Sequence, residues 1–174
     1  MTDEELYTEI AQYIRDNVGI PDVPVVQRYQ PQTGGVSTGV QIMLDKIGDK
    51  RYGFPREVDV WDEDAQEMVH THTQLIESNF QISAMQPNGA TEDVTASDVV
   101  GDVADLLQTQ AAVAHFRGRG LAFVRVTDIR NPAFTDDRDR NEKEPSFDFT
   151  VLHSRVRVSI LPGTSATMAD IKRV

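Results

Sequence analysis

The stretch QEMVHTHTQLIESNFQISAMQ (residues 66–86) decides the fold, because its side chains alternate with the period of two that is typical of a β-strand. At about 3.3 Å per residue, such a strand reaches about 60 Å, which is more than a domain of this size can bury. We therefore expect part of it to project as a long hairpin. Its partner is an edge strand at Arg56–Trp61, and the acidic segment Asp62–Asp64 forms the turn.

The apolar side of this long strand changes near Leu75–Ile76. The apolar positions are first Val69, Thr71, Thr73 and Leu75, and then Ile76, Phe80, Ile82 and Ala84. A bulge or bend is expected at the change, because one extra residue moves every later side chain to the other face. A second long strand, Phe147–Leu161, shows a similar change near Val151–Leu152.

The remaining elements complete an α+β pattern. A T-x-x-E capping box at Thr2 begins a helix expected over Asp3–Asn17. A second helix is expected to begin at Thr95 and to run without a break to the glycines of Arg117–Gly120. Shorter strands are expected at Val25–Val26, Gly39–Ile47 and Leu121–Ile129, with a turn at Gly48–Gly53. The sum predicts a mainly antiparallel sheet with two helices packed on it, in one domain over 1–161, followed by a flexible tail over 162–174.

Composition excludes several classes of function. The chain of 174 residues contains no cysteine, so a disulfide framework, a thiol nucleophile and a cysteine-ligated metal are excluded. Its 28 acids against 17 bases give a net charge of -11, which argues against a protein that grips DNA. The charge is -14 over residues 1–116 and +3 over 117–174, a polarity that suits head-to-tail association and that solvated surface explains equally well. No leader and no membrane span is expected, because no apolar run approaches about 20 residues.

Two clusters could carry metal chemistry. His70 and His72 lie on one face of the long strand, a spacing that can chelate zinc, but a catalytic site also needs a third ligand and a carboxylate that activates water. The loop over 131–146 is rich in carboxylates, but its interleaved arginines compete for them and it lacks a calcium-loop register. We therefore expect no catalytic residue, no metal site and no cofactor, and we interpret the two histidines as solvent-facing or interface side chains.

Three blocks of the sequence resemble a known family. They are YGFPR (residues 52–56) continued by QLIESNFQISAM (74–85), TASDVVGDVADLLQ (95–108) and VRVTDIRNPAFTDDRDRNEKEPSFDF (124–149). These blocks are similar to the neck proteins of long-tailed, mostly contractile-tailed bacteriophages, called gateway or neck terminator proteins. The most specific part is the string R-N-P-x-F-x-D-D-R-D-R followed by P-S-F-D-F, which has no generic structural reason to recur.

The resemblance implies a non-enzymatic virion protein that assembles in the host cytoplasm as a ring, with six copies as the expected number. The ring would join the head connector or collar above to the tail tube and sheath below, cap the tube and leave a channel through which DNA passes without specific binding. Residues expected at the subunit or ring interface are Arg130, Pro132, Phe134, Asp136, Asp137, Arg138 and Arg140, together with Trp61, His70 and His72. The alternatives are a tail completion or minor tail component and, less favoured, a divalent-metal hydrolase that uses His70 and His72.

Overall fold

The computed structural model describes residues 1–20, 23–27, 39–85, 94–135 and 141–162. Its elements are three helices and seven strands, in the order α1 (Asp3–Asn17), β1 (Val25–Gln27), β2 (Gln41–Asp62), β3 (Glu67–Met85), α2 (Ala96–Leu107), α3 (Gln110–Gly118), β4 (Leu121–Val126), β5 (Ala133–Thr135), β6 (Asn141–Lys143) and β7 (Ser146–Pro162). Residues 163–174, which make up most of the predicted tail, lie outside the described part.

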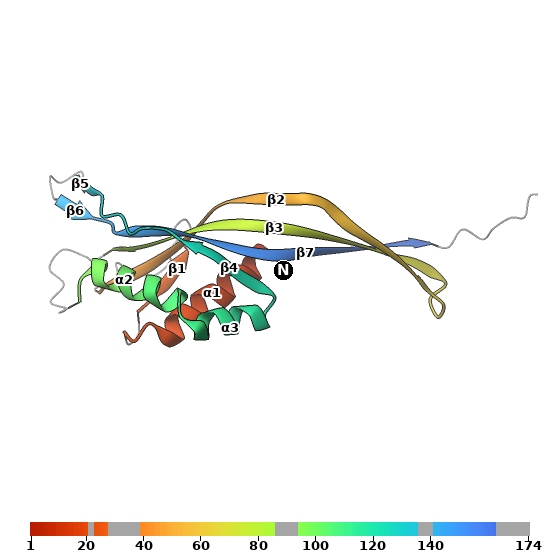
Figure 1. The fold of residues 1–174 in the computed structure, drawn as a ribbon, viewed down its shortest axis with the longest axis horizontal. Coiled ribbons are helices and arrows are strands. Elements are labelled where there is room, and N and C mark those ends of the chain that lie inside the picture. The colour runs from red at the N-terminus through yellow and green to blue at the C-terminus, as the bar shows by residue number, and fades with distance from the viewer. Residues whose placement is uncertain (21–22, 28–38, 86–93, 136–140, 163–174) are drawn as a thin grey trace, which may run out of the picture.

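The strands form one five-stranded sheet in the order β1-β2-β3-β7-β4, and β5 and β6 form a separate two-stranded sheet. The pair β1–β2 is parallel, and every other strand pair of the described residues is antiparallel. The predicted α+β class with a mainly antiparallel sheet is therefore confirmed. The three helices lie together on one side of the sheet, and β2, β3 and β7 continue well past them (Figure 1).

The first helix has the predicted bounds, and both hydrogen bonds of its capping box form between Thr2 and Glu5. The prediction of a single second helix is wrong, because the chain breaks after Leu107 into α2 and α3. The hydroxyl oxygen of Thr109 accepts a hydrogen bond from the backbone N–H of Ala112 at 3.1 Å and caps α3. The break turns the amphipathic face, so that Phe116 packs into the core.

The core lies between the helices and the inner half of the sheet, and aromatic rings fill its centre. Phe80 on β3 is fully buried, with its ring 5.4 Å from that of Phe149 on β7 and 5.5 Å from that of Tyr7 on α1. Phe123 stacks on the other side of Phe149 at 5.4 Å. These rings join α1, β3, β7 and β4, segments far apart in the sequence, into one packed unit.

The predicted turn at Gly48–Gly53 is wrong, because β2 is one continuous strand. Two irregularities in its pairing with β3 accommodate the glycines, one between Lys46 and Gly48 and one between Tyr52 and Arg56. In the first, one extra residue is inserted, and in the second three residues of β2 face one residue of β3. Within the described residues, β1 pairs with Ile42–Leu44 alone, so the outer part of β2 is an edge of the described sheet, as its proline predicts.

The bulge or bend expected near Leu75–Ile76 is found only on the side of β3 that pairs with β2, where the irregularity at Tyr52–Arg56 faces Thr73–Leu75 and its extra residues belong to β2. The β3–β7 register runs without a shift from Ser83↔Ser146 to Glu67↔Pro162, so that the same alternation holds over the whole length. The apolar side chains of β3 therefore lie on different faces of the sheet in its two halves. In the inner half they lie beneath the helices, and in the outer half they lie on the opposite side of the sheet. The apolar side chains of β7 likewise change faces near Val151–Leu152. The register shift at this place is in the pairing of β7 with β4, between Phe123 and Arg125.

Candidate interaction surface

The outer parts of three strands form an arm, defined as Arg56–Asp62 of β2, Glu67–Thr73 of β3 and Val156–Pro162 of β7. In this arm β3 is the central strand, paired with β2 on one side and β7 on the other. At its tip, the carboxylate of Asp62 accepts hydrogen bonds from the backbone N–H groups of Asp64 and Ala65, each at 3.0 Å. This closes the turn between β2 and β3. The arm lies beyond the helices, so that neither of its faces is covered by them (Figure 1).

One face of the arm is an apolar stripe, defined by Val58, Val60, Val156, Val158 and Ile160. Val58 and Val158 both pair with Thr71, Val60 and Ile160 both pair with Val69, and Val156 pairs with Thr73, so the five side chains lie on one face across the three strands. The five side chains are between 37% and 59% exposed. Soluble proteins rarely leave a contiguous apolar patch open to water unless another molecule covers it. The stripe therefore has the properties of a contact surface.

Phe54 is the most exposed large apolar side chain of the described residues, at 99%. It lies in the three-residue irregularity of β2, beside Gly53, whose positive φ of 61° suits glycine. The side chain of Gln74 donates to the carbonyl of Tyr52 at 2.8 Å and so stabilises this irregularity from the neighbouring strand. The result is an aromatic ring held out at this edge of the described sheet, which is typical of an interface anchor. We did not single out Phe54 from the sequence, although the G-F-P string that causes the irregularity was visible there.

The other face of the arm carries three of the residues predicted at an interface, namely Trp61, His70 and His72. The histidines face acids on β2. His72 Nε2 lies 2.8 Å from Glu57 Oε1, and His70 Nδ1 is paired with Asp59. The two imidazole centroids are 5.1 Å apart, and Trp61 is 43% exposed nearer the tip. The structure therefore brings these three residues together on one surface, opposite the apolar stripe.

Three of the other predicted interface residues, Arg130, Pro132 and Phe134, lie in or just before β5, and β5 and β6 lie at the opposite end of the long axis from the hairpin tip (Figure 1). Arg130 pairs with the carboxylate of Asp148 at 2.7 Å, and its backbone bridges to Ser146. Pro132 is exposed, and Phe134 is in β5 opposite Glu142. The remaining four, Asp136, Asp137, Arg138 and Arg140, lie outside the described residues. The predicted site is thus divided between two distant places.

A polar network joins the buried side chains of Ser78 and His153 to the exposed Asp49. Ser78 Oγ donates to Asp49 Oδ1 at 2.6 Å and lies 3.0 Å from His153 Nε2. Since the one hydroxyl proton is given to Asp49, His153 Nε2 must be the donor to Ser78. Nδ1 of His153 is buried without a hydrogen-bond partner. This order is not that of a catalytic triad, in which histidine stands between serine and acid and accepts the serine proton.

The surroundings shift two pKa values in this network. Burial lowers the pKa of His153, and the nearby cations of Lys46, the N-terminus and Arg155 lower it further, against the opposing effect of Asp49. Burial alone would raise the pKa of Asp49, but hydrogen bonds from Lys46 and Ser78 outweigh burial and hold it below its usual range. The network therefore favours a neutral imidazole beside a carboxylate that is ionised.

The lowered pKa of His153 predicts a pH-dependent stability. The unfolded chain takes up a proton at the ordinary histidine pKa of 6.5, before the folded protein does, so acid favours unfolding in that window. We expect the free energy of unfolding, measured by urea denaturation, to fall between about pH 8 and about pH 5, and to fall less steeply in His153→Asn. His115→Asn, which removes a half-exposed histidine, is the matched control. Equal slopes in the wild type and His153→Asn would contradict the assignment.

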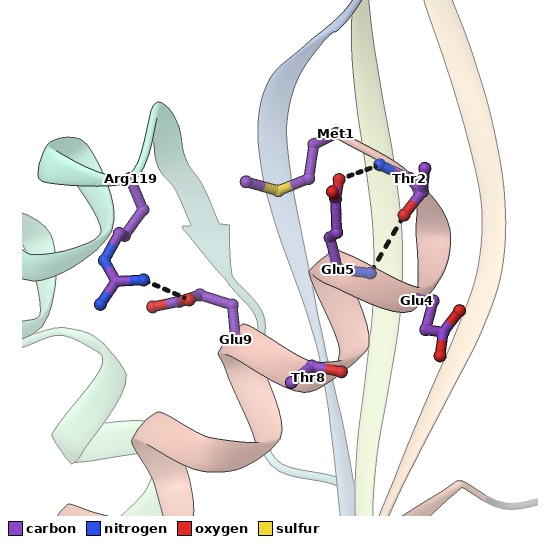
Figure 2. A pocket seen from close by; sticks show the side chains of 7 residues that line it. All are labelled: Met1, Thr2, Glu4, Glu5, Thr8, Glu9 and Arg119. Carbon is purple, nitrogen blue, oxygen red and sulfur yellow. Dashed lines mark hydrogen bonds and ion pairs between the residues drawn. The ribbon is translucent and has the colours of Figure 1, made fainter.

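A shallow surface pocket lies along the first two turns of α1 and is closed on one side by Arg119 (Figure 2). Two of its three carboxylates, those of Glu5 and Glu9, have partners. Glu5 accepts from the backbone of Thr2 at 2.6 Å, and Glu9 pairs with Arg119 at 3.0 Å and with His115 at 2.8 Å. The pocket therefore offers an open, acidic surface and no arrangement of free catalytic groups.

The fold has a solved counterpart. The structure superimposes on a solved one described as "Cryo-EM Structure of an Extracellular Contractile Injection System, PVC sheath/tube terminator in extended state", with a TM-score of 0.56 and 12% sequence identity. The match covers 100% of this chain and 64% of the terminator, so this chain spans less than two thirds of that protein's length. At this identity the likeness concerns the fold, which is therefore that of a sheath/tube terminator. No curated protein matches the sequence.

The family is more specific. Residues 5–162 match the family described as E217 gateway protein gp29, and this chain therefore belongs to that family of phage gateway proteins. The resemblance to phage neck proteins is thus confirmed, as is a structural role in the phage tail or neck. The family and the solved neighbour are structural proteins rather than enzymes. Among the described residues, no helix is long and apolar enough to cross a membrane.

Proposed function

We propose that this protein forms a ring of six copies at the head-to-tail junction of a long-tailed phage. The ring joins the connector or collar to the tail tube and sheath, caps the tube and leaves a channel for DNA. The single observation that carries the proposal is the match to the gateway family over residues 5–162. The exposed arm, with Phe54 at its edge, supports it, because such a surface is suited to contacts between chains.

We also propose how the molecule divides its contacts. The apolar stripe and Phe54 serve one contact, and the loop at the far end of the long axis serves another, so that a head-to-tail arrangement can close a ring. In the loop, Pro132 and Phe134 are the proposed apolar anchors, with Arg130, Asp136, Asp137, Arg138 and Arg140 as charged partners. Trp61, His70 and His72 are the proposed contacts on the other face of the arm. Residues 1–161 act as one domain, and 162–174 as a tail.

The charge distribution suits the proposed channel. With a net charge of -11, the chain repels phosphates overall, and DNA can pass such a surface without binding to it. The virion, after assembly in the host cytoplasm, is the proposed location. A tail completion or minor tail role uses the same kind of contact surface, so the position along the particle distinguishes the two. The hydrolase is less favoured, because the histidines and their carboxylate partners lie on an open strand surface, outside the pocket along α1.

The proposal is tested by native mass spectrometry over a range of concentrations, followed by negative-stain imaging alone and with purified tail tubes. We expect a closed ring with a central hole, either free in solution or on the head-proximal end of the tube. A protein that stays monomeric alone and does not bind tube ends would contradict the proposal. Labelling at another position along intact particles would favour the minor tail role.

The loop carries its own prediction. The double substitution of Phe134 and Arg138 with alanine is expected to weaken ring or neck assembly by about 30-fold or more, because aromatic and arginine anchors dominate interfaces. Circular dichroism checks that the variant remains folded. Assembly on tail tubes is measured by sedimentation with Arg117→Ala, an exposed cation of α3, as the control. Unchanged assembly would remove the loop from the interface.

A further inference from the structure

Glu57, His70 and His72 place one potential ligand atom each within 4.8 Å of one another. The two histidines come from β3, and Glu57 is the register partner of His72 on β2. The sequence alone does not reveal Glu57 as a third ligand, because only the pairing of β2 with β3 brings it next to the histidines. We propose that these three side chains bind a divalent transition-metal ion, zinc foremost, and that the ion links β2 to β3 in the arm. The proposal does not rest on the proposed ring, although it uses two side chains, His70 and His72, that are also proposed as contacts there.

The chemistry of the ligands favours zinc. Two imidazoles and one carboxylate are a nitrogen and oxygen set that zinc accepts in tetrahedral geometry. Zinc bonds of about 2.0–2.2 Å need the most widely separated ligand atoms to come closer than the 4.8 Å limit, whereas His72 Nε2 and Glu57 Oε1 are already 2.8 Å apart. The side chains are free to move closer, since His72 is 38% exposed and Glu57 is 56% exposed. The ion would replace the proton now shared between His72 Nε2 and Glu57 Oε1.

A second observation comes from Asp59. Its carboxylate is paired with Nδ1 of His70, which leaves Nε2 of that ring available to a metal. Histidines that bind metals regularly donate their other ring N–H to a carboxylate, which fixes the ring and raises its basicity. Asp59 is therefore a positioning residue for His70. The arm thus supplies three ligands and one supporting carboxylate from two paired strands.

The charge around the site also suits a cation. Arg157 on β7 is opposite His72 in the register and lies on the same face, with Ser159 opposite His70. The two carboxylates of Glu57 and Asp59 outweigh this guanidinium, so the local charge with neutral histidines is negative. Three protein ligands leave one position of a tetrahedral ion open to water. Because the ion joins strands beyond the irregularity at Tyr52–Arg56, it would hold the outer pairing in register.

The test is zinc titration of the full chain by isothermal calorimetry, after removal of metal with a chelator. We expect one zinc per chain with a Kd in the micromolar range or below, and slower amide exchange in Arg56–Thr73 when zinc is bound. The amide exchange shows whether the ion binds in the arm. The heat measured by calorimetry does not show where it binds.

Three variants decide the assignment. His72→Ala and Glu57→Gln are each expected to weaken zinc binding at least tenfold, and Asp59→Asn to weaken it about tenfold through the orientation of His70. The matched control is His115→Ala, since His115 is also paired with a glutamate, at 2.8 Å, but has no second histidine beside it. Absence of zinc binding to the wild type, or binding that survives both ligand substitutions, would overturn the proposal. Circular dichroism confirms that each variant is folded.

Discussion

Replacing Phe80 with alanine is expected to lower the free energy of unfolding by about 3–5 kcal/mol. Phe80 is fully buried, and its ring stacks on Phe149 and meets Tyr7 edge to face. Truncation to alanine removes the contacts of Phe80 with Phe149 and with Tyr7. It leaves a cavity between α1 and the sheet that the two remaining rings do not fill completely. The free energy of unfolding of a domain is only about 5–15 kcal/mol, so a loss of this size would strongly raise the unfolded fraction at physiological temperature.

Urea denaturation followed by circular dichroism measures this loss. The matched control is Phe54→Ala, the same substitution at a side chain that is 99% exposed, for which the change should stay within about 0.5 kcal/mol. Equal losses for the two variants would show that the core does not lie where the structure places it. The contrast is informative because residue type and the deleted atoms are identical and only burial differs.

The second large effect is the reverse of the first. Phe54→Ala is expected to leave the free energy of unfolding unchanged and to weaken assembly on tail tubes by about 30-fold or more, equivalent to about 2 kcal/mol at an interface anchor. The physical reason is that the ring now exposes its whole apolar surface to water, and a partner that covers it gains that burial. This prediction rests on the proposed ring.

Assembly is measured by sedimentation with purified tubes and by negative-stain counting of capped ends. Phe54→Trp, which keeps a large aromatic ring, should retain most of the binding, whereas Lys50→Ala on the same strand serves as a nearby polar control. If Phe54→Ala caps tubes as well as the wild type does, Phe54 is not an anchor. Loss of folding in Phe54→Ala would instead show that its ring packs within the chain.

The variants Phe80→Ala and Phe54→Ala also distinguish a residue needed for stability from one needed for assembly. The residues that match the gateway family include both phenylalanines, so the match by itself does not say which is needed for the fold. Burial assigns Phe80 to the core and exposure assigns Phe54 to the surface. A complementation experiment in a phage should therefore show little soluble protein for the first variant and soluble, inactive protein for the second.

The sequence by itself determined the elements whose signals are local. The capping box and the apolar spacing placed α1 at Asp3–Asn17, because both act within one or two helical turns. The period of two placed the long strands and hence the α+β class, and the specific R-N-P-x-F string carried the family resemblance. The edge position of outer β2 in the described sheet also followed from one proline.

Only the tertiary structure decided what depends on partners far along the chain. The pattern at Leu75–Ile76 showed that the apolar side changes, but the same pattern fits a bulge that keeps one face apolar and a straight strand that changes faces. The unbroken β3–β7 pairing selected the second and so created the exposed stripe. Pairing likewise carried Glu57 to His72, and the irregularity opposite Gln74 turned Phe54 outward. Local preferences extend over a few residues, whereas registers and burial are set by packing between segments that the sequence holds far apart.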